Sequence, residues 1–297
     1  MLLANILSSR IANDIALGTT GGVIIGLVGL SLVMIWQSTH VLNFAQGSMA
    51  MFATFLGLIN IEHGMNVWLA IGLSVLAGVV VGAVTERTIV RPLYGKPELN
   101  SIVVMIGLSL FLTTLATSIW SNYPHIFTSP FSTTYFMSGD TATGLSPFTL
   151  FQIVTSVVVM LAVAALFKFT KLGLQLRASA ISPEVAKLLG VRVGRMLTIG
   201  WALSTAVGAV AGVVMGLSDF GLTPIVLDSI FVYGFIAAAV GGLESPTGAL
   251  ISGVLIGIIT QFVTDYKGVS YAMFVCVIIL VISLLARPQG ILSLIHI

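Results

Sequence analysis

Eight long stretches of this chain contain no aspartate, glutamate, lysine or arginine. They cover residues 15–61, 63–85, 99–139, 141–167, 196–218, 229–243, 245–264 and 268–286. A helix needs about 20 mostly apolar residues to cross the hydrocarbon of a bilayer, and a charge at its centre costs roughly 2.5–3.5 kcal/mol on insertion scales. Because the charges are confined to the segments between these stretches, the chain is expected to cross a membrane several times.

The composition agrees with a membrane protein. Hydrophobic residues make up 57% and charged residues 7% of the 297 positions, which is less charge than a soluble protein of this size carries. We count nine hydrophobic segments, or eight to ten when short and broken segments are allowed for. The nine lie near residues 16–35, 44–60, 67–84, 102–119, 148–167, 197–216, 229–243, 248–263 and 270–286. The predicted fold is an all-α, polytopic bundle of transmembrane helices, some discontinuous, forming a single transmembrane domain over residues 1–291.

Basic residues are concentrated in the loop over residues 168–196, which has a single acid, Glu184. Its six cations are Lys168, Lys171, Arg177, Lys187, Arg192 and Arg195. The positive-inside rule therefore predicts that this loop is cytoplasmic, and Arg287 places the C-terminus on the same side. The loop over residues 120–147 has neither lysine nor arginine and should face outward. Nine spans then place the N-terminus outside, although Arg10 argues weakly against this.

Small residues recur at intervals of four along several segments. One run consists of Gly200, Ser204, Gly208, Gly212 and Gly216. A second consists of Gly241, Ser245, Ala249, Gly253 and Gly257. Ridges of small residues allow membrane helices to approach closely, so these segments are expected to pack against other helices rather than face lipid.

A polar but uncharged segment over residues 37–48 interrupts the first long apolar stretch. Asn43 and Gln46 are three residues apart, so on a helix both amides face the same side and can offer donors and acceptors to a small polar solute. Irregular backbone of this kind often lines transport sites. The candidate pathway residues are Asn43, Gln46, Gly47 and Ser48. The alternative is an ordinary cytoplasmic turn in which the amides serve as helix caps.

The basic loop contains a short sequence with both helix start and helix stop signals. Ser182 suits an N-cap, Pro183 the first helical position, Glu184 the positive helix end and Gly190 the left-handed conformation that ends a helix. Two turns are too short to be stable alone. The remaining residues of the segment are Val185, Ala186, Lys187, Leu188 and Leu189. Its apolar side suits insertion into a groove on a partner, and the alternative is a helix resting on lipid headgroups.

A third break occurs at residues 241–249, where two glycines and Pro246 loosen the chain. Glu244 at this break is either a functional carboxylate within the membrane or, as its place at a bend favours, a solvated residue of a turn.

Residue patterns that would support enzymatic chemistry are missing. The four histidines are scattered, one cysteine cannot form a thiolate metal site, and the sequence has no phosphate-binding loop. The chain is therefore predicted to be neither an enzyme nor a nucleic-acid-binding protein, and to need no metal or cofactor of its own.

Several short motifs together resemble the permease subunit of branched-chain amino-acid ABC importers, the LivH type. They are Asn43-Phe44-Ala45-Gln46-Gly47, Glu86-Arg87 followed by Arg91-Pro92-Leu93, Ile106-Gly107-Leu108-Ser109, Leu188-Leu189-Gly190-Val191, Gly241-Gly242 with Ser245-Pro246-Thr247-Gly248-Ala249, and Arg287-Pro288-Gln289-Gly290. The resemblance covers roughly residues 15–291. Each motif is weak alone, but the set, in this order and spacing, is specific.

The resemblance implies a subunit in the bacterial cytoplasmic membrane that forms half of a translocation pathway. Its partners would be a second related permease, two cytoplasmic ATPase subunits that hold ATP and Mg²⁺, and a periplasmic solute-binding protein. The segment over residues 182–189 would be the coupling helix that docks on an ATPase subunit.

Two positions depart from the family pattern. Ser48 stands where such permeases commonly have an acid, and Glu244 stands where glycine is usual. Urea, short amides or other amino acids are therefore alternative cargoes. A self-sufficient secondary transporter or channel is a further alternative, but few acids are placed to couple ion movement.

The last six residues, 292–297, read like the translation of a transposon-end sequencing adaptor. We interpret them as an assembly artefact rather than as part of the natural protein.

Overall fold

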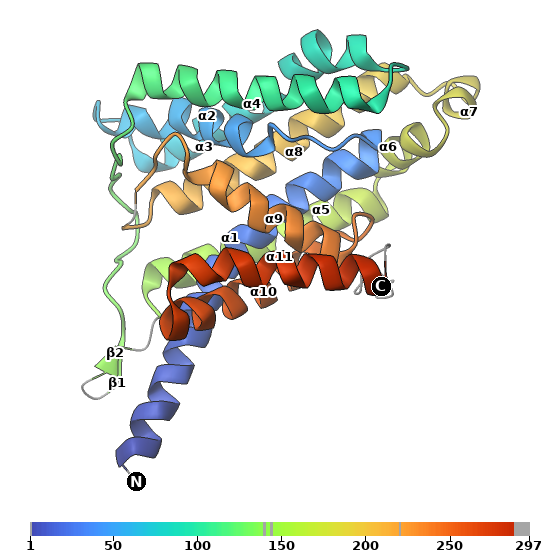
Figure 1. Ribbon diagram of the computed structural model, residues 1–297. Coiled ribbons are helices and arrows are strands. Elements are labelled where there is room, and N and C mark those ends of the chain that lie inside the picture. Colours follow the sequence, from blue (N-terminus) through green and yellow to red (C-terminus); the bar gives the residue numbers. More distant parts are fainter. Residues whose placement is uncertain (1, 139–140, 143–144, 220, 288–297) are drawn as a thin grey trace.

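The computed structural model describes residues 2–138, 141–142, 145–219 and 221–287. The described chain is a bundle of helices with one small hairpin, β1 (Met137–Ser138) paired antiparallel with β2 (Thr141–Ala142) (Figure 1). The helices are α1 (Leu2–Thr39), α2 (Gln46–Leu58), α3 (Val67–Thr85), α4 (Glu98–Trp120), α5 (Pro147–Phe169), α6 (Lys171–Ile181), α7 (Pro183–Leu188), α8 (Val193–Gly216), α9 (Val226–Gly241), α10 (Pro246–Lys267) and α11 (Val269–Ala286). Residues 292–297 lie outside the described residues, so the structure does not test their interpretation.

Seven helices of the described chain are long and apolar enough to cross a membrane. They are α1, α3, α4, α5, α8, α10 and α11. Two shorter apolar helices, α2 and α9, account for the other two predicted hydrophobic segments. The predicted polytopic all-α fold is thereby confirmed, whereas the count of nine crossings stays a prediction.

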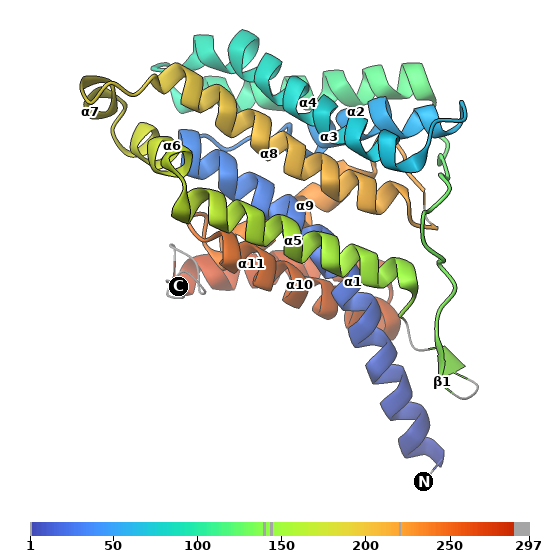
Figure 2. The same ribbon diagram turned by 180° about the vertical axis from the view of Figure 1, so that it is seen from behind.

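Helices α1 and α8 form the centre of the bundle. Most residues in the apolar part of each are buried, whereas most residues in the apolar parts of α3, α4, α5 and α11 are partly or fully exposed. Leu27 and Leu30 of α1 and Val214 of α8 belong to one buried cluster. Figure 2 shows α1 running obliquely through the bundle and crossing behind α5. Exposed apolar faces on the outer helices are what a bundle surrounded by lipid requires.

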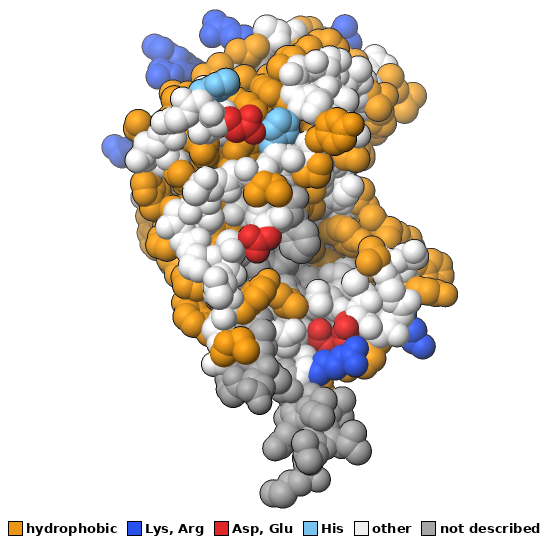
Figure 3. Space-filling view, turned by 90° about the vertical axis from the view of Figure 1, so that its left-hand side faces the viewer, with side chains coloured by type: hydrophobic (Ala, Val, Ile, Leu, Met, Phe, Trp, Pro, Cys, Tyr) orange, Lys and Arg blue, Asp and Glu red, His pale blue; other side chains and the backbone are white. Residues whose placement is uncertain are grey.

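The two predicted loops lie at opposite ends of the bundle. Helices α6 and α7 and the end of α11 are at one end, and residues 121–138 and the start of α1 are at the other (Figures 1 and 2). Seen from the end with residues 121–138, the surface is mostly hydrophobic or uncharged, with a few charged side chains (Figure 3). The two loops were predicted to lie on opposite sides of the membrane, and their places at opposite ends of the bundle agree with this. Which end faces the cytoplasm stays a prediction.

The closest helix pairing joins α1 to α10 through glycines. A Cβ at Gly22 would lie 2.6 Å from the Cα of Val254, and a Cβ at Gly257 would collide with the backbone of Gly22. The next turns repeat this contact between Gly26 and Gly253. Since backbone meets backbone, dispersion and weak polar contacts between the helices are at their strongest here.

Candidate functional site

The predicted polar break is present between α1 and α2. Helix α1 ends at Thr39, residues 40–45 are not helical, and α2 begins at Gln46. His40 has a φ of 52°, which turns the chain away from the helix axis. Six extended residues reach at most about 20 Å, and a helix of 13 residues adds about 20 Å. Together they form a discontinuous segment comparable in length to one crossing.

The small-residue ridge of α8 locates this break inside the bundle. Each glycine of the ridge faces a different residue of α1 or α2, which a Cβ added to that glycine would contact. Gly200 faces Ser38, Gly208 faces Gln46, Gly212 faces Thr54 and Gly216 faces Leu58. The remaining ridge residue, Ser204, donates a hydrogen bond to the carbonyl of Ser31 at 2.6 Å. The ridge therefore follows the end of α1 and then the whole of α2. Gln46 lies beside the middle of α8 rather than at a cytoplasmic turn.

The amides of Asn43 and Gln46 face the same side, and they bind each other. Asn43 Nδ2 donates to Gln46 Oε1 at 3.0 Å, and Asn43 Oδ1 accepts from the amide of Ala45 at 2.9 Å. Gln46 Nε2 donates to the carbonyl of Ser204 at 3.2 Å. Both side chains are at most 1% exposed. In this conformation the two amides hold the break together within the bundle, but neither caps α2, whose N-cap residue is Ala45 and which receives no capping hydrogen bond from a side chain.

Gly47 and Ser48, the other two candidate pathway residues, are also buried. Ser48 donates to the carbonyl of Ala45 at 3.0 Å, which satisfies its hydroxyl within the first turn of α2. Contact between these residues and a transported solute stays a prediction.

Gly47 brings an unpredicted residue, Asp228, into the site. A Cβ at Gly47 would lie 2.7 Å from the carbonyl oxygen of Leu227 and 3.0 Å from Asp228 Oδ1. Asp228 Oδ2 accepts a hydrogen bond from Thr113 Oγ1 of α4 at 2.8 Å. Sequence reasoning passed over Asp228 because it directly precedes a charge-free segment, and an acid there resembles a loop boundary. The helices α2 and α9 thus begin side by side.

Three phenylalanines lie next to this junction. The ring centroid of Phe44 is 6.4 Å from those of Phe231 and Phe235, which are themselves 6.5 Å apart. All three are partly exposed. Phe231 and Phe235 follow Asp228 by three and seven residues, so the carboxylate and both rings lie along one face of α9.

The predicted helix in the basic loop is α7, and its end has the expected geometry. Pro183 is its first residue, and Gly190 has a φ of 81°. Val191 donates to the carbonyl of Ala186 at 2.9 Å and Gly190 to that of Lys187 at 3.0 Å, which is the Schellman pattern. Ser182 occupies the N-cap position, but its side chain makes no capping hydrogen bond.

The apolar residues of α7 point away from the bundle. Val185, Leu188 and Leu189 are 53%, 87% and 77% exposed, whereas Ala186 is 2% exposed and faces inward. The preceding helix α6 is anchored by Leu176, which is fully buried among residues of α1, α5 and α8. An apolar surface is therefore displayed on a helix whose base is packed against the bundle.

An ion pair between the buried Glu86 and the partly exposed Arg91 joins the end of α3 to the start of α8, next to α7. Arg91 Nη2 lies 3.0 Å from Glu86 Oε2, and it also donates to the carbonyl of Gly194 at 2.7 Å and to Thr198 Oγ1 at 2.8 Å. Thr198 in turn donates to Glu86 Oε2 at 2.6 Å. Glu86 is fully buried, so removal of Arg91 would leave an uncompensated charge. This cluster connects the α7 end of the molecule to the bundle.

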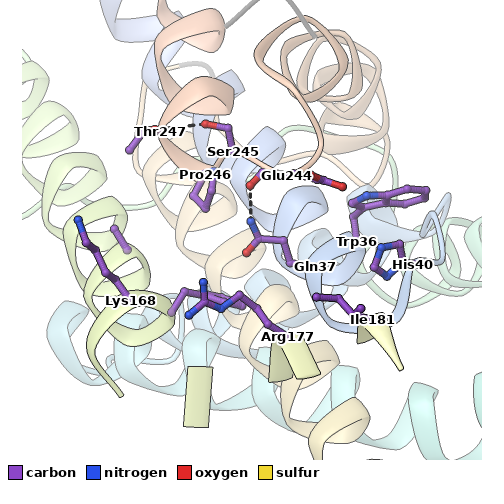
Figure 4. A pocket seen from close by; sticks show the side chains of 12 residues that line it. Trp36, Gln37, His40, Lys168, Arg177, Ile181, Glu244, Ser245, Pro246 and Thr247 are labelled. Atoms are coloured by element: carbon purple, nitrogen blue, oxygen red, sulfur yellow. Dashed lines mark hydrogen bonds between the residues drawn. The ribbon is translucent and has the colours of Figure 1, made fainter. Parts of the chain in front are cut away.

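A cavity of about 430 Å³ opens at the same end, between α1, α5, α6 and the turn before α10 (Figure 4). Lys168 and Arg177 line it together with Gln37, which donates to the carbonyl of Glu244 at 2.5 Å. Glu244 is exposed in that turn, as expected for a solvated turn residue. The cavity does not include the junction of α2 and α9.

No group of three or more His, Cys, Asp or Glu side chains within the described part of the chain is placed to hold a metal ion. Whether the subunit works without a cofactor of its own stays a prediction.

Residues 15–284 match the family described as the permease component of the branched-chain amino acid transport system. The chain belongs to this family. The high-affinity branched-chain amino acid transport system permease protein LivH of Escherichia coli K12 is 27% identical over 293 residues, which cover 95% of this chain and 94% of the relative. A probable LivH of Methanocaldococcus jannaschii is 30% identical over 280 residues, covering 89% and 87%. The permease BraD of Pseudomonas aeruginosa is 27% identical over 288 residues, covering 93% and 94%.

The family match confirms the resemblance inferred from the motifs. The chain is a multi-pass membrane permease subunit of the ABC importer type, and a transport component rather than an enzyme.

Proposed function

We propose that this protein is the permease subunit of an ATP-driven importer for branched-chain amino acids and forms half of its translocation pathway. The observation that carries the proposal is the family match across residues 15–284. The complete importer would contain a second related permease, two cytoplasmic ATPase subunits that bind ATP and Mg²⁺, and a periplasmic solute-binding protein. The α7 end and the C-terminus would face the cytoplasm of a bacterial cell.

Helix α7 is proposed as the coupling helix. Its exposed apolar side chains, Val185, Leu188 and Leu189, would become buried in a groove of an ATPase subunit. Movement of α7 would reach the bundle through α6, whose Leu176 is packed in the core, and through the carbonyl of Gly194, which accepts from Arg91. The structure thus offers two routes from the docking surface to α1, α3 and α8.

Reconstitution in sealed proteoliposomes tests the proposal. The complete importer should accumulate leucine only when ATP and the loaded binding protein are supplied, whereas this chain alone should be inert. Leucine flux through the isolated chain would instead indicate a secondary transporter or channel. Uptake of urea, a short amide or an unrelated amino acid in preference to leucine would overturn the proposed cargo but leave the importer class intact.

A further inference from the structure

Asp228, unlike Asp265 and Glu86, has no cationic partner among the described residues. Asp265 is 2.6 Å from Arg10, and Glu86 is 3.0 Å from Arg91. No lysine, arginine or histidine of the described residues lies within ion-pair distance of the Asp228 carboxylate. A carboxylate accepts about four hydrogen bonds, and Thr113 supplies the one that the structure shows. Asp228 therefore has capacity for a further, positively charged donor.

Asp228 lies away from both ends of the bundle. It adjoins Gly47, and the preceding residue, Gln46, packs beside Gly208, away from both ends of α8. Its partner Thr113 is likewise an interior residue of α4. A carboxylate at membrane depth is costly unless a cation compensates it, and such groups mark solute or ion pathways.

Asp14 of α1 is another acid for which the described residues supply no ion-pair partner, and its surroundings are closed. It is 3% exposed, accepts a long hydrogen bond of 3.4 Å from Gln261, and keeps its second oxygen enclosed. Asp228 is instead partly exposed, and so are the three phenylalanines beside it. Of the two carboxylates, only that of Asp228 belongs to a residue that is partly exposed.

We infer that Asp228 receives the ammonium group of the amino-acid cargo where α2 and α9 begin. The inference rests on the proposed function. Phe44, Phe231 and Phe235 would contact the apolar side chain of the cargo, since both α9 rings lie on the face that carries Asp228. The positive end of the α2 dipole at Gly47 adjoins the same place and suits the carboxylate of the cargo. A zwitterion with an apolar side chain therefore finds a complementary group for each of its parts.

Transport by the reconstituted complete importer, with leucine-loaded binding protein, tests the assignment. Asp228→Asn should lower the maximal leucine uptake rate per assembled complex by about 10- to 100-fold, the range expected for a lost charge-assisted contact. The concentration of loaded binding protein that gives half-maximal uptake should not change. Asp228→Glu should recover part of the rate, because the charge is kept.

A purely structural role, in which Asp228 only ties α4 to α9, is tested by Thr113→Val. This variant removes the hydrogen bond but keeps the carboxylate. We expect uptake within about threefold of the wild type, which is less than the effect of one charged contact. Equal loss in Thr113→Val and Asp228→Asn would overturn the assignment.

Direct binding provides a second readout that does not depend on a functional Asp228→Asn importer. Leucine should raise the melting temperature of the complete wild-type complex without binding protein, and 4-methylpentanoate, which lacks the ammonium group, should not. Equal stabilisation by both compounds would contradict the inference. If the wild type imports leucine and Asp228→Asn imports it equally well, the assignment fails and the proposed function stands. A wild-type importer that does not take up leucine would instead refute the proposed function.

Discussion

His125, in the loop between α4 and α5, has oxygen acceptors at both ring nitrogens. Nδ1 lies 2.8 Å from Glu62 Oε1, and Nε2 lies 2.6 Å from the carbonyl oxygen of Trp120. Both contacts are hydrogen bonds only when both nitrogens carry protons. Partial burial lowers the pKa of His125, but its hydrogen bonds with Glu62 and Trp120 and the charge of Glu62 outweigh this, so the pKa lies above its ordinary value. The loop is thereby tied to the turn before α3.

This pair predicts a pH-dependent stability. Because the pKa of folded His125 is raised above the ordinary value of about 6.5, the stabilisation is fully present below about pH 6.5 and is lost as the pH rises through the folded pKa. As the pH rises from about 6.5 through the raised pKa of His125, the melting temperature of the purified wild-type protein in detergent should therefore fall. The melting temperature of His125→Gln should fall less over the same pH range. His63→Gln, at an exposed histidine of the same end, is the matched control and should behave like the wild type. Identical pH profiles of His125→Gln and the wild type would refute the prediction.

At the scale of elements, the contact between α1 and α10 depends on whether a glycine faces the partner helix. Gly22 faces it, with Val254 Cα 2.6 Å from the position of an added Cβ, whereas the neighbouring Gly21 has no atom within 4 Å of that position. Both residues are glycines of α1, but Gly22 packs against α10 and Gly21 faces open space. They separate the effect of packing from that of helix propensity.

We expect Gly22→Ala to destabilise the protein by about 1–3 kcal/mol, the usual cost of overpacking, because backbone atoms of α10 cannot move aside as a flexible side chain can. Gly21→Ala should be neutral or stabilising by up to about 1 kcal/mol through helix propensity. Reversible unfolding in mixed micelles measures both. A destabilisation of equal size in the two variants would show that the close approach of α1 and α10 is not the reason why residue 22 must be small.

Helix α7 has an exposed apolar surface that does not pack against the bundle. Replacing Leu188 and Leu189 by Asp should leave membrane insertion intact and abolish ATP-driven uptake, because docking would bury unpaired charge. Lys187→Asp, on another side of the same helix, also adds negative charge and should retain most of the uptake. Uptake by reconstituted importers and membrane-fraction immunoblots measure the two properties. Normal transport by the double variant would remove the coupling role from α7.

At the scale of the whole molecule, one end of the bundle carries most of the lysines and arginines, and the other end carries few of them. Leu188 of α7 is 87% exposed at the first, and Tyr123 is 79% exposed at the second. Their separation across the bundle predicts that they lie on opposite sides of the membrane, with Leu188 in the cytoplasm.

Labelling of single cysteines tests this topology. In a Cys276→Ala background, which removes the native thiol, Tyr123→Cys should react with a membrane-impermeant maleimide in intact cells. Leu188→Cys should react only after the membrane is permeabilised. The reverse pattern would invert the orientation, and labelling of both in intact cells would contradict a transmembrane arrangement of the bundle.

Local signals in the sequence were sufficient for the elements and the class of protein. Apolar length located the helices, because a membrane helix satisfies its backbone within its own segment. Pro183 and Gly190 marked the start and the end of α7, because helix start and stop signals depend only on neighbouring residues. The order and spacing of several short motifs resembled those of a known family, and the family match over residues 15–284 confirmed this resemblance.

Only the tertiary structure decided what surrounds the break before α2. The amides of Asn43 and Gln46 were predicted to share a side, but their enclosure by Ser204 depends on a helix far away in sequence. In the same way, Asp228 became a candidate because it lies beside Gly47. The physical reason is that hydropathy and capping act over a few residues, whereas burial, depth and charge compensation depend on which distant helices pack together.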